Sequence, residues 1–91
     1  MKKMELCRGR HEIPEAVDGA IFGQQLNPLD VDGMERTAAA AVAGLDALTL
    51  YVTGLSVALV AVINACRAQG VELTLMHYDR ESGSYYPQHV L

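Results

Sequence analysis

Polar side chains that could bind an anion occur in two runs of the sequence. The first is Thr53-Gly54-Leu55-Ser56, which lies between two apolar segments. Its glycine lets the backbone come close to a ligand, its hydroxyls can donate to phosphate or hydroxyl oxygens, and a helix that begins here offers free N–H groups. The second is His77-Tyr78-Asp79-Arg80, whose histidine can donate or carry a proton and whose arginine can clamp a phosphate. Both runs predict a site for a compact anionic ligand.

Each run also has a structural interpretation that the sequence leaves open. Gly54 and Ser56 are typical of a tight turn and a helix cap. Asp79 and Arg80 are typical of a surface ion pair in a turn.

Two further groups add polar or aromatic side chains. Arg10-His11-Glu12 follows the first predicted strand, and His11 with Glu12 could act as an acid/base pair, although neighbours in an extended chain point to opposite sides. Tyr85 and Tyr86 could stack on a base or pack in an interface. We include Arg10 and His11 in the predicted ligand site.

The familiar motifs of cofactor and metal chemistry do not occur in the sequence. GxGxxG, the P-loop lysine, HExxH and a Ser-His-Asp order are all missing. Cys7 and Cys66 stand far apart with no CxxC, so they predict neither a zinc site nor a disulfide framework. We expect no cofactor and no metal.

The net charge of −4 has the wrong sign for a surface that neutralises many duplex phosphates. The charge is unevenly distributed, because the amino end is a small basic island and a run of acids follows it. The island consists of Lys2, Lys3, Arg8 and Arg10 against Glu5. Bulk DNA binding is therefore not expected, whereas a compact anion could bind near the amino end.

Ninety-one residues, of which 51% are hydrophobic and 20% charged, predict one folded domain over residues 1–91. No apolar segment follows the basic start, so a secretory signal is not expected. Residues 47–66 are uncharged over the nominal length of a membrane span, but the turn signature inside them favours a buried strand, a turn and a buried helix. The prediction is a cytoplasmic protein that does not enter a membrane.

Periodicity and turn residues predict the order of the elements. Apolar residues recur at helical spacing at Val31, Met34, Ala38, Val42 and Leu45. Strands are predicted over Met4–Arg8, Ala20–Phe22, Ala47–Thr53, Val71–His77 and Tyr85–Val90; helices from Val31 to about Gly44 and over Val57–Gln69; a loop over Gly9–Gly19; and a turn over Asp79–Ser84.

This order predicts an α/β fold, a small and mostly parallel Rossmann-like sheet with helices packed on it and an antiparallel C-terminal edge strand. Pro87 is tolerable on such an edge. Because the carboxyl ends of parallel strands meet at one edge of a sheet, Thr53–Ser56 and His77–Arg80 are expected to converge there. Arg10 and His11 join them if the first strand is parallel.

The helix over Val57–Gln69 is apolar around nearly its whole circumference, so something besides the sheet should cover it. We expect a homodimer, or a higher homo-oligomer, that packs these helices together. The alternative is that the first helix or the amino-terminal loop covers the helix within one chain.

The segment from Tyr51 to Leu59, YVTGLSVAL, resembles the strand, threonine-glycine turn and helix of CRISPR-associated Rossmann-fold (CARF) domains, and the later segment Val71–Arg80 is also similar. Leu55 stands where the family has a second glycine, and no lysine follows. CARF domains bind cyclic oligoadenylates across a dimer. The resemblance implies a stand-alone protein of antiviral defence that sequesters or degrades a signalling nucleotide.

Three functions are therefore considered. The first is a homo-oligomeric protein that sequesters a compact anionic ligand, of the cyclic nucleotide class. The second is a metal-independent ring nuclease that positions a ribose hydroxyl for attack on its own phosphate, with His11, His77 and Arg80 as candidates. The third is a structural subunit that binds a protein partner.

Overall fold

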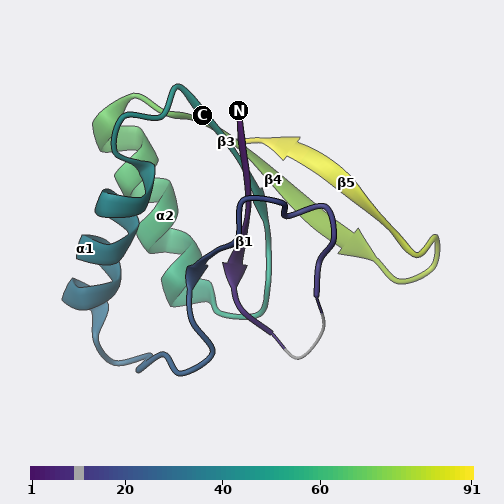
Figure 1. Cartoon of the computed structure of the whole chain (residues 1–91), viewed down its shortest axis with the longest axis horizontal. Helices are drawn as coiled ribbons and strands as arrows, with labels where there is room; N and C mark the ends of the chain where they lie inside the picture. The colour runs from purple at the N-terminus through teal and green to yellow at the C-terminus, as the bar shows by residue number, and fades with distance from the viewer. Residues whose placement is uncertain (10–11) are drawn as a thin grey trace.

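A five-stranded mixed sheet carries both helices on one of its faces (Figure 1). The computed structural model describes residues 1–9 and 12–91. The elements are β1 (Lys2–Cys7), β2 (Ala20–Phe22), α1 (Val31–Val42), β3 (Ala47–Tyr51), α2 (Ser56–Gln69), β4 (Glu72–Asp79) and β5 (Ser84–His89). The predicted α/β fold with a mostly parallel sheet is confirmed.

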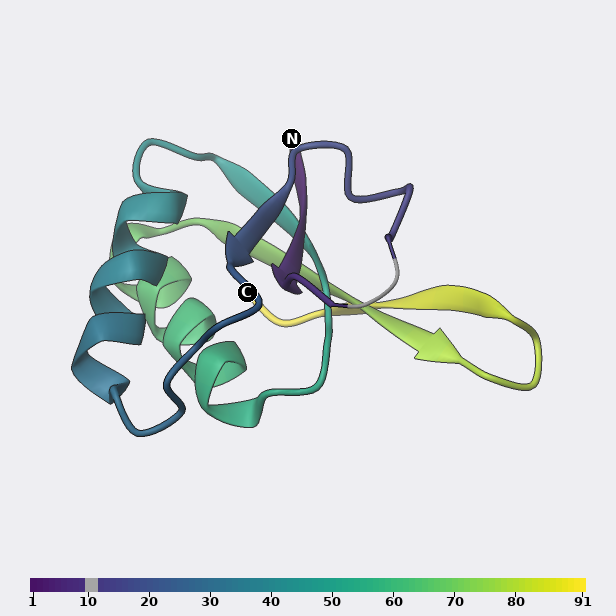
Figure 2. The same ribbon diagram turned by 60° about the horizontal axis from the view of Figure 1, so that its bottom comes forward.

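The strand order is β2-β1-β3-β4-β5, with parallel pairing from β2 to β4 and antiparallel pairing of β5 on β4. From β1 the chain moves to one edge of the sheet, and from β2 onward it moves to the other. Right-handed crossovers that run in opposite directions pass over opposite faces. The crossover after β1 accordingly runs on the face without helices (Figure 2).

The core lies between the sheet and the two helices. β3 and β4 contribute Leu48, Leu50, Leu73 and Leu75, and α1 contributes Met34, Ala38 and Val42 at steps of four residues. On the opposite face the Thr49 hydroxyl contacts the sulfur of Met1 at 3.0 Å. β3 is thus buried from both sides, as its apolar sequence predicts.

The ends of the helices follow local sequence signals, with one exception. Asp30 caps α1, because its Oδ1 accepts a hydrogen bond from Gly33 N at 3.0 Å. Gly70 ends α2 at a φ of 69°. The interpretation of Ser56 as the cap of α2 is wrong, since the helix begins at Ser56, Leu55 takes the cap position and no side chain makes a capping bond.

Strand limits differ from the prediction where tertiary pairing decides them. β3 ends at Tyr51 instead of Thr53, because its registered pairing with β1 and with β4 ends at Tyr51. β4 continues to Asp79 instead of His77, because β5 pairs with it out to the register Asp79↔Ser84. None of the described helices is long and apolar enough to cross a bilayer.

Candidate functional site

A cavity of about 270 Å³ lies at the carboxyl end of the parallel strands. It is lined by the last residue of β1 and by residues that follow β1, β2 and β3: Cys7, Arg8, Gly9, Gly23, Gln24, Leu26, Thr53, Gly54 and Leu55. The chain leaves the adjacent strands β1 and β3 in opposite directions, so the cavity lies at the point where the strand order reverses. In open α/β sheets this is the usual position of a ligand.

Three glycines, Gly9, Gly23 and Gly54, contribute to the cavity wall. Among the residues that the structure describes, a Cβ atom built on any of the three would meet nothing within 4 Å. None of them has the positive φ that the described Gly19 and Gly70 have. Neither backbone strain nor neighbouring protein atoms therefore require glycine here, and the missing side chains leave backbone open to the cavity.

Thr53 ties the ends of β1 and β3 together. Its Oγ1 accepts a hydrogen bond from Cys7 N at 3.0 Å and donates one to Cys7 O at 3.0 Å. The hydroxyl proton that the sequence offered to a ligand is therefore already bonded to the protein. Thr53 positions the backbone of the cavity.

Gln24 bridges two sides of the cavity, because its Nε2 donates to the carbonyl of Gly9 at 3.2 Å. Sequence reasoning missed the cavity residues after β1 and β2, namely Cys7, Arg8, Gly9, Gly23, Gln24 and Leu26. One signal could have found most of them, since a glycine directly follows each of the first two predicted strands, in Arg8-Gly9 and in Phe22-Gly23.

Arg8 brings the positive charge to the cavity wall. Its Nε lies 3.7 Å from Oε1 of the buried Glu5, while half of the arginine side chain is exposed. A partly exposed pair of this kind contributes little stability, about 0–1 kcal/mol. An anion in the cavity could therefore compete with Glu5 for the guanidinium.

Cys7 places a thiol in the same wall. Burial raises its pKa, and the negative charge of Glu5 raises it further, while the nearby Thr53 hydroxyl acts in the opposite direction. The thiol is neutral at pH 7, which argues against a nucleophilic role.

The second predicted run lies elsewhere, on the β4–β5 hairpin. β4 runs three residues past Met76, the partner of Tyr51, and the hairpin projects away from the helices (Figure 2). The Asp79 carboxylate accepts hydrogen bonds from Ser82 N and Glu81 N. Hydrogen bonding from Ser82, and then from Glu81, holds the pKa of Asp79 below its usual value. The structure does not bring His77, Asp79 or Arg80 into the cavity, so the expected convergence is wrong.

The other side chains of the hairpin pack on one another. His77 Nε2 lies 2.8 Å from Gln88 Oε1, and its ring centroid lies 5.4 Å from that of Tyr86. Tyr85 makes edge-to-face contacts with Tyr51 at 4.9 Å and with Tyr78 at 5.3 Å. Burial, reinforced by Glu15, raises the pKa of both Tyr51 and Tyr85. Tyr78 and Tyr85 pair with one another near the turn of the hairpin, and Tyr51 at the end of β3 packs against Tyr85.

Two more predicted residues, Arg10 and His11, lie outside the described residues. Ser56 is exposed, at the first position of α2, directly after the cavity residue Leu55. Among the described residues, no group of three or more possible metal ligands is found.

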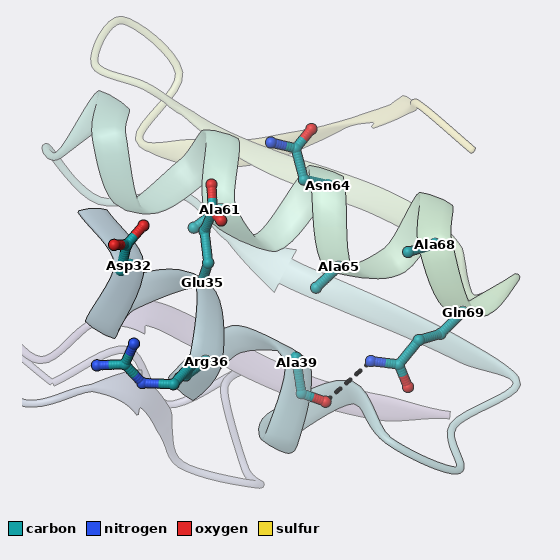
Figure 3. Close-up of a pocket in the computed structure, with 9 residues that line it drawn as sticks. All are labelled: Asp32, Glu35, Arg36, Ala39, Ala61, Asn64, Ala65, Ala68 and Gln69. Atoms are coloured by element: carbon teal, nitrogen blue, oxygen red, sulfur yellow. Dashed lines mark hydrogen bonds between the residues drawn. The ribbon is translucent and has the colours of Figure 1, made fainter.

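A larger groove of about 500 Å³ runs between α1 and α2 on the outer face of the helix layer (Figure 3). Its floor is formed by alanines, including Ala39, Ala61 and Ala65, and its rim carries Asp32, Glu35, Arg36, Asn64 and Gln69. Gln69 Nε2 donates to Ala39 O at 3.0 Å and closes one end. No strand end reaches this groove, so we assign the ligand site to the smaller cavity.

The chain matches no protein-family model and has no significant match among curated proteins or solved structures. The resemblance to CARF domains therefore rests on the residues of Tyr51–Leu59 and Val71–Arg80 alone.

Proposed function

We propose that this protein binds a compact anionic ligand of the nucleotide class in the cavity at the carboxyl end of its sheet. The observation that supports the proposal is the group of three glycines, which follow three neighbouring strands and open backbone to one cavity without any structural need for glycine. A wall of exposed backbone suits the close approach of phosphate oxygens.

Two features with positive charge lie beside this wall, the amino end of α2 and the side chain of Arg8. α2 begins directly after the cavity residue Leu55, and its first internal hydrogen bond runs from Leu59 N to Leu55 O. The N–H groups before Leu59 have no partner inside the helix and form the positive end of the helix dipole. The half-exposed guanidinium of Arg8 supplies a full charge on the strand side.

The volume limits the size of the ligand. At about 270 Å³ the cavity lies near the lower end of the range for small-molecule sites. It suits one phosphate with its sugar or base, so a cyclic oligonucleotide would extend beyond one subunit. The resemblance to CARF domains points to the same ligand class.

Sequestration is favoured over cleavage. Of the proposed nuclease residues, His77 and Arg80 lie on the hairpin outside the cavity. The thiol in the cavity is held neutral. No described side chain of the cavity wall is therefore suited to acid/base work near pH 7, and the geometry best supports a binding protein.

Thermal unfolding against a panel of cyclic di-, tri-, tetra- and hexanucleotides and nucleotide sugars tests the proposal, with each mixture analysed by chromatography afterwards. We expect stabilisation by one class, with the ligand recovered intact. A cleaved product would instead identify a nuclease. If no ligand raises the melting temperature, the ligand-binding proposal is wrong and a protein partner becomes the better interpretation.

The Gly54→Val variant tests whether the ligand binds in this cavity. The added side chain meets no protein atom within 4 Å at its Cβ, so it fills the cavity and leaves the fold intact. We expect at least about a tenfold loss of affinity by calorimetry. Ala43→Val is the matched control, because Ala43 is exposed and has extended backbone at the end of α1. Equal affinity in both variants would remove the site from this cavity.

A further inference from the structure

Glu5 is an acidic residue in the interior of the sheet. It is 5% exposed, and in the register of β1 it lies between Ala20 of β2 and Tyr51 of β3. Among the described residues, its ion pair is with Arg8, whose Nε lies 3.7 Å from Glu5 Oε1. A buried carboxylate is costly without such a counter-charge, because water reaches it poorly. Arg8 therefore compensates for the charge of Glu5.

The same pair holds the charged end of Arg8 beside residues that do not line the cavity. A Cβ atom built on Gly19 would lie 4.0 Å from Nη2 of Arg8, and the carbonyl of Gly19 accepts a hydrogen bond from Glu5 N at 2.9 Å. On β1 the cavity wall begins only at Cys7, the last residue of the strand. Arg8 thus contributes to the cavity wall while its charge is paired outside that wall.

We propose that Glu5 is a positioning residue that competes with the ligand for Arg8, so that charge alone is not sufficient for binding in the cavity. This inference rests on the proposed function. An anion that draws the guanidinium away leaves Glu5 buried without its counter-charge, and this cost offsets part of the free energy that the new ion pair contributes.

The competition separates two classes of anion. Inorganic phosphate and pyrophosphate bring charge and little else to the cavity. A nucleotide also packs its sugar or base against the half-buried side chains of Leu26 and Leu55, and burial of that apolar surface supplies the remaining free energy. The cavity therefore accepts a nucleotide and binds a bare inorganic anion weakly.

Calorimetry with inorganic pyrophosphate tests the competition. Glu5→Gln keeps the shape of the side chain and removes its charge, so we expect this variant to bind pyrophosphate at least about threefold tighter than the wild type does. A merely structural role of Glu5 predicts the opposite, since loss of a stabilising pair would loosen the site. An equal or weaker affinity in Glu5→Gln would overturn the proposal.

The matched control is Glu15→Gln, the same change at an exposed glutamate in the crossover after β1. It lowers the total negative charge equally and should alter the affinity for pyrophosphate by less than about 1.5-fold. An equal gain in both variants would show a general effect of net charge and would overturn the competition for Arg8.

Two measurements show whether Glu5 acts through Arg8. In an Arg8→Gln background no guanidinium is withheld from the ligand, so the gain from Glu5→Gln should shrink, and an unchanged gain would contradict the proposal. The second measurement needs no Glu5 variant. The Nε–H signal of Arg8, assigned in NMR spectra by its loss in Arg8→Gln, should shift as pyrophosphate saturates the wild-type protein. A signal that stays in place at saturation would show that the pair with Glu5 is not broken.

The nucleotide panel distinguishes failure of this inference from failure of the proposed function. If neither the wild type nor Glu5→Gln binds pyrophosphate or any nucleotide of the panel, the proposed function is wrong and the competition with it. If the wild type binds a nucleotide and Glu5→Gln brings no gain, the proposed function stands and only the competition is wrong.

Discussion

The roles of single residues depend on which atoms they bond. Thr53 was predicted as a ligand donor because it precedes a glycine in a turn. In the structure both hydrogen bonds of its hydroxyl go to the backbone of Cys7, a residue 46 positions earlier in the chain. No local pattern contains that contact, so sequence reasoning could place Thr53 at the site but could not give its role.

Cys7 offers a direct probe of the cavity. Its thiol is partly accessible, whereas Cys66 is fully buried in the core. We expect maleimide to modify Cys7 in the folded protein slowly at pH 7 and faster as the pH rises past 9.0, because burial raises its pKa above that value. Mass spectrometry of peptides measures the two sites separately.

Cys66 serves as the internal control of this experiment, because it should react only on unfolding. A bound ligand should also protect Cys7, which lines the cavity. Equal reactivity of the two thiols in the folded protein would contradict the packing of α2 on the sheet.

At the scale of elements, the β4–β5 hairpin shows what a pattern can and cannot predict. The turn at Asp79–Ser84 follows from its residue types, with Gly83 at a φ of 68°. The residue types do not predict the length of β4, because its last residues are extended only through their pairing with β5. That extension carries Arg80 beyond the end of β3 and away from the cavity.

β5 is an edge strand whose free side is blunted. Val90 N donates to Leu73 O, so in the register of the pair the backbone groups of Pro87 point away from β4. The missing N–H of Pro87 therefore lies on the free side of β5, where it costs the sheet no hydrogen bond. It also discourages pairing with the edge of another sheet.

Asp79 should make the hairpin turn sensitive to acid. Hydrogen bonds lower the pKa of Asp79 in the folded protein, so its contribution to the turn is present above pH 3.8 and is lost as the pH falls through the folded value. The amide shift of Ser82, followed by NMR, should titrate with a midpoint below 3.8. Asp79→Asn should abolish that titration, and a midpoint above 3.8 would show that the bonds do not form.

At the scale of the whole molecule, the fold was predictable because each β-α-β unit carries its own signals in periodicity, caps and turns. The helix residues Met34, Ala38 and Val42 are buried as their spacing predicts. The site was predictable only at β3, because the other half of the cavity comes from the crossover after β1 and from the short strand β2. Which strands become neighbours is decided by pairing between distant segments, and the sequence left the place of the first strand open.

Stability and binding should be separable in this molecule, because the core lies away from the cavity wall. Leu50 is 0% exposed on β3, the middle strand of the sheet, and Leu50→Ala should lower the free energy of unfolding by about 2–5 kcal/mol. For a domain of this size each kcal/mol shifts the melting temperature by roughly 4–8 °C. Leu29→Ala, at a leucine that is 87% exposed, is the matched control and should change the free energy of unfolding by less than about 0.5 kcal/mol.

Below its own melting temperature the Leu50→Ala variant should still bind ligand, since β3 still pairs with β1 and delivers Gly54 to the cavity. Equal melting temperatures for the two variants would contradict the central position of β3.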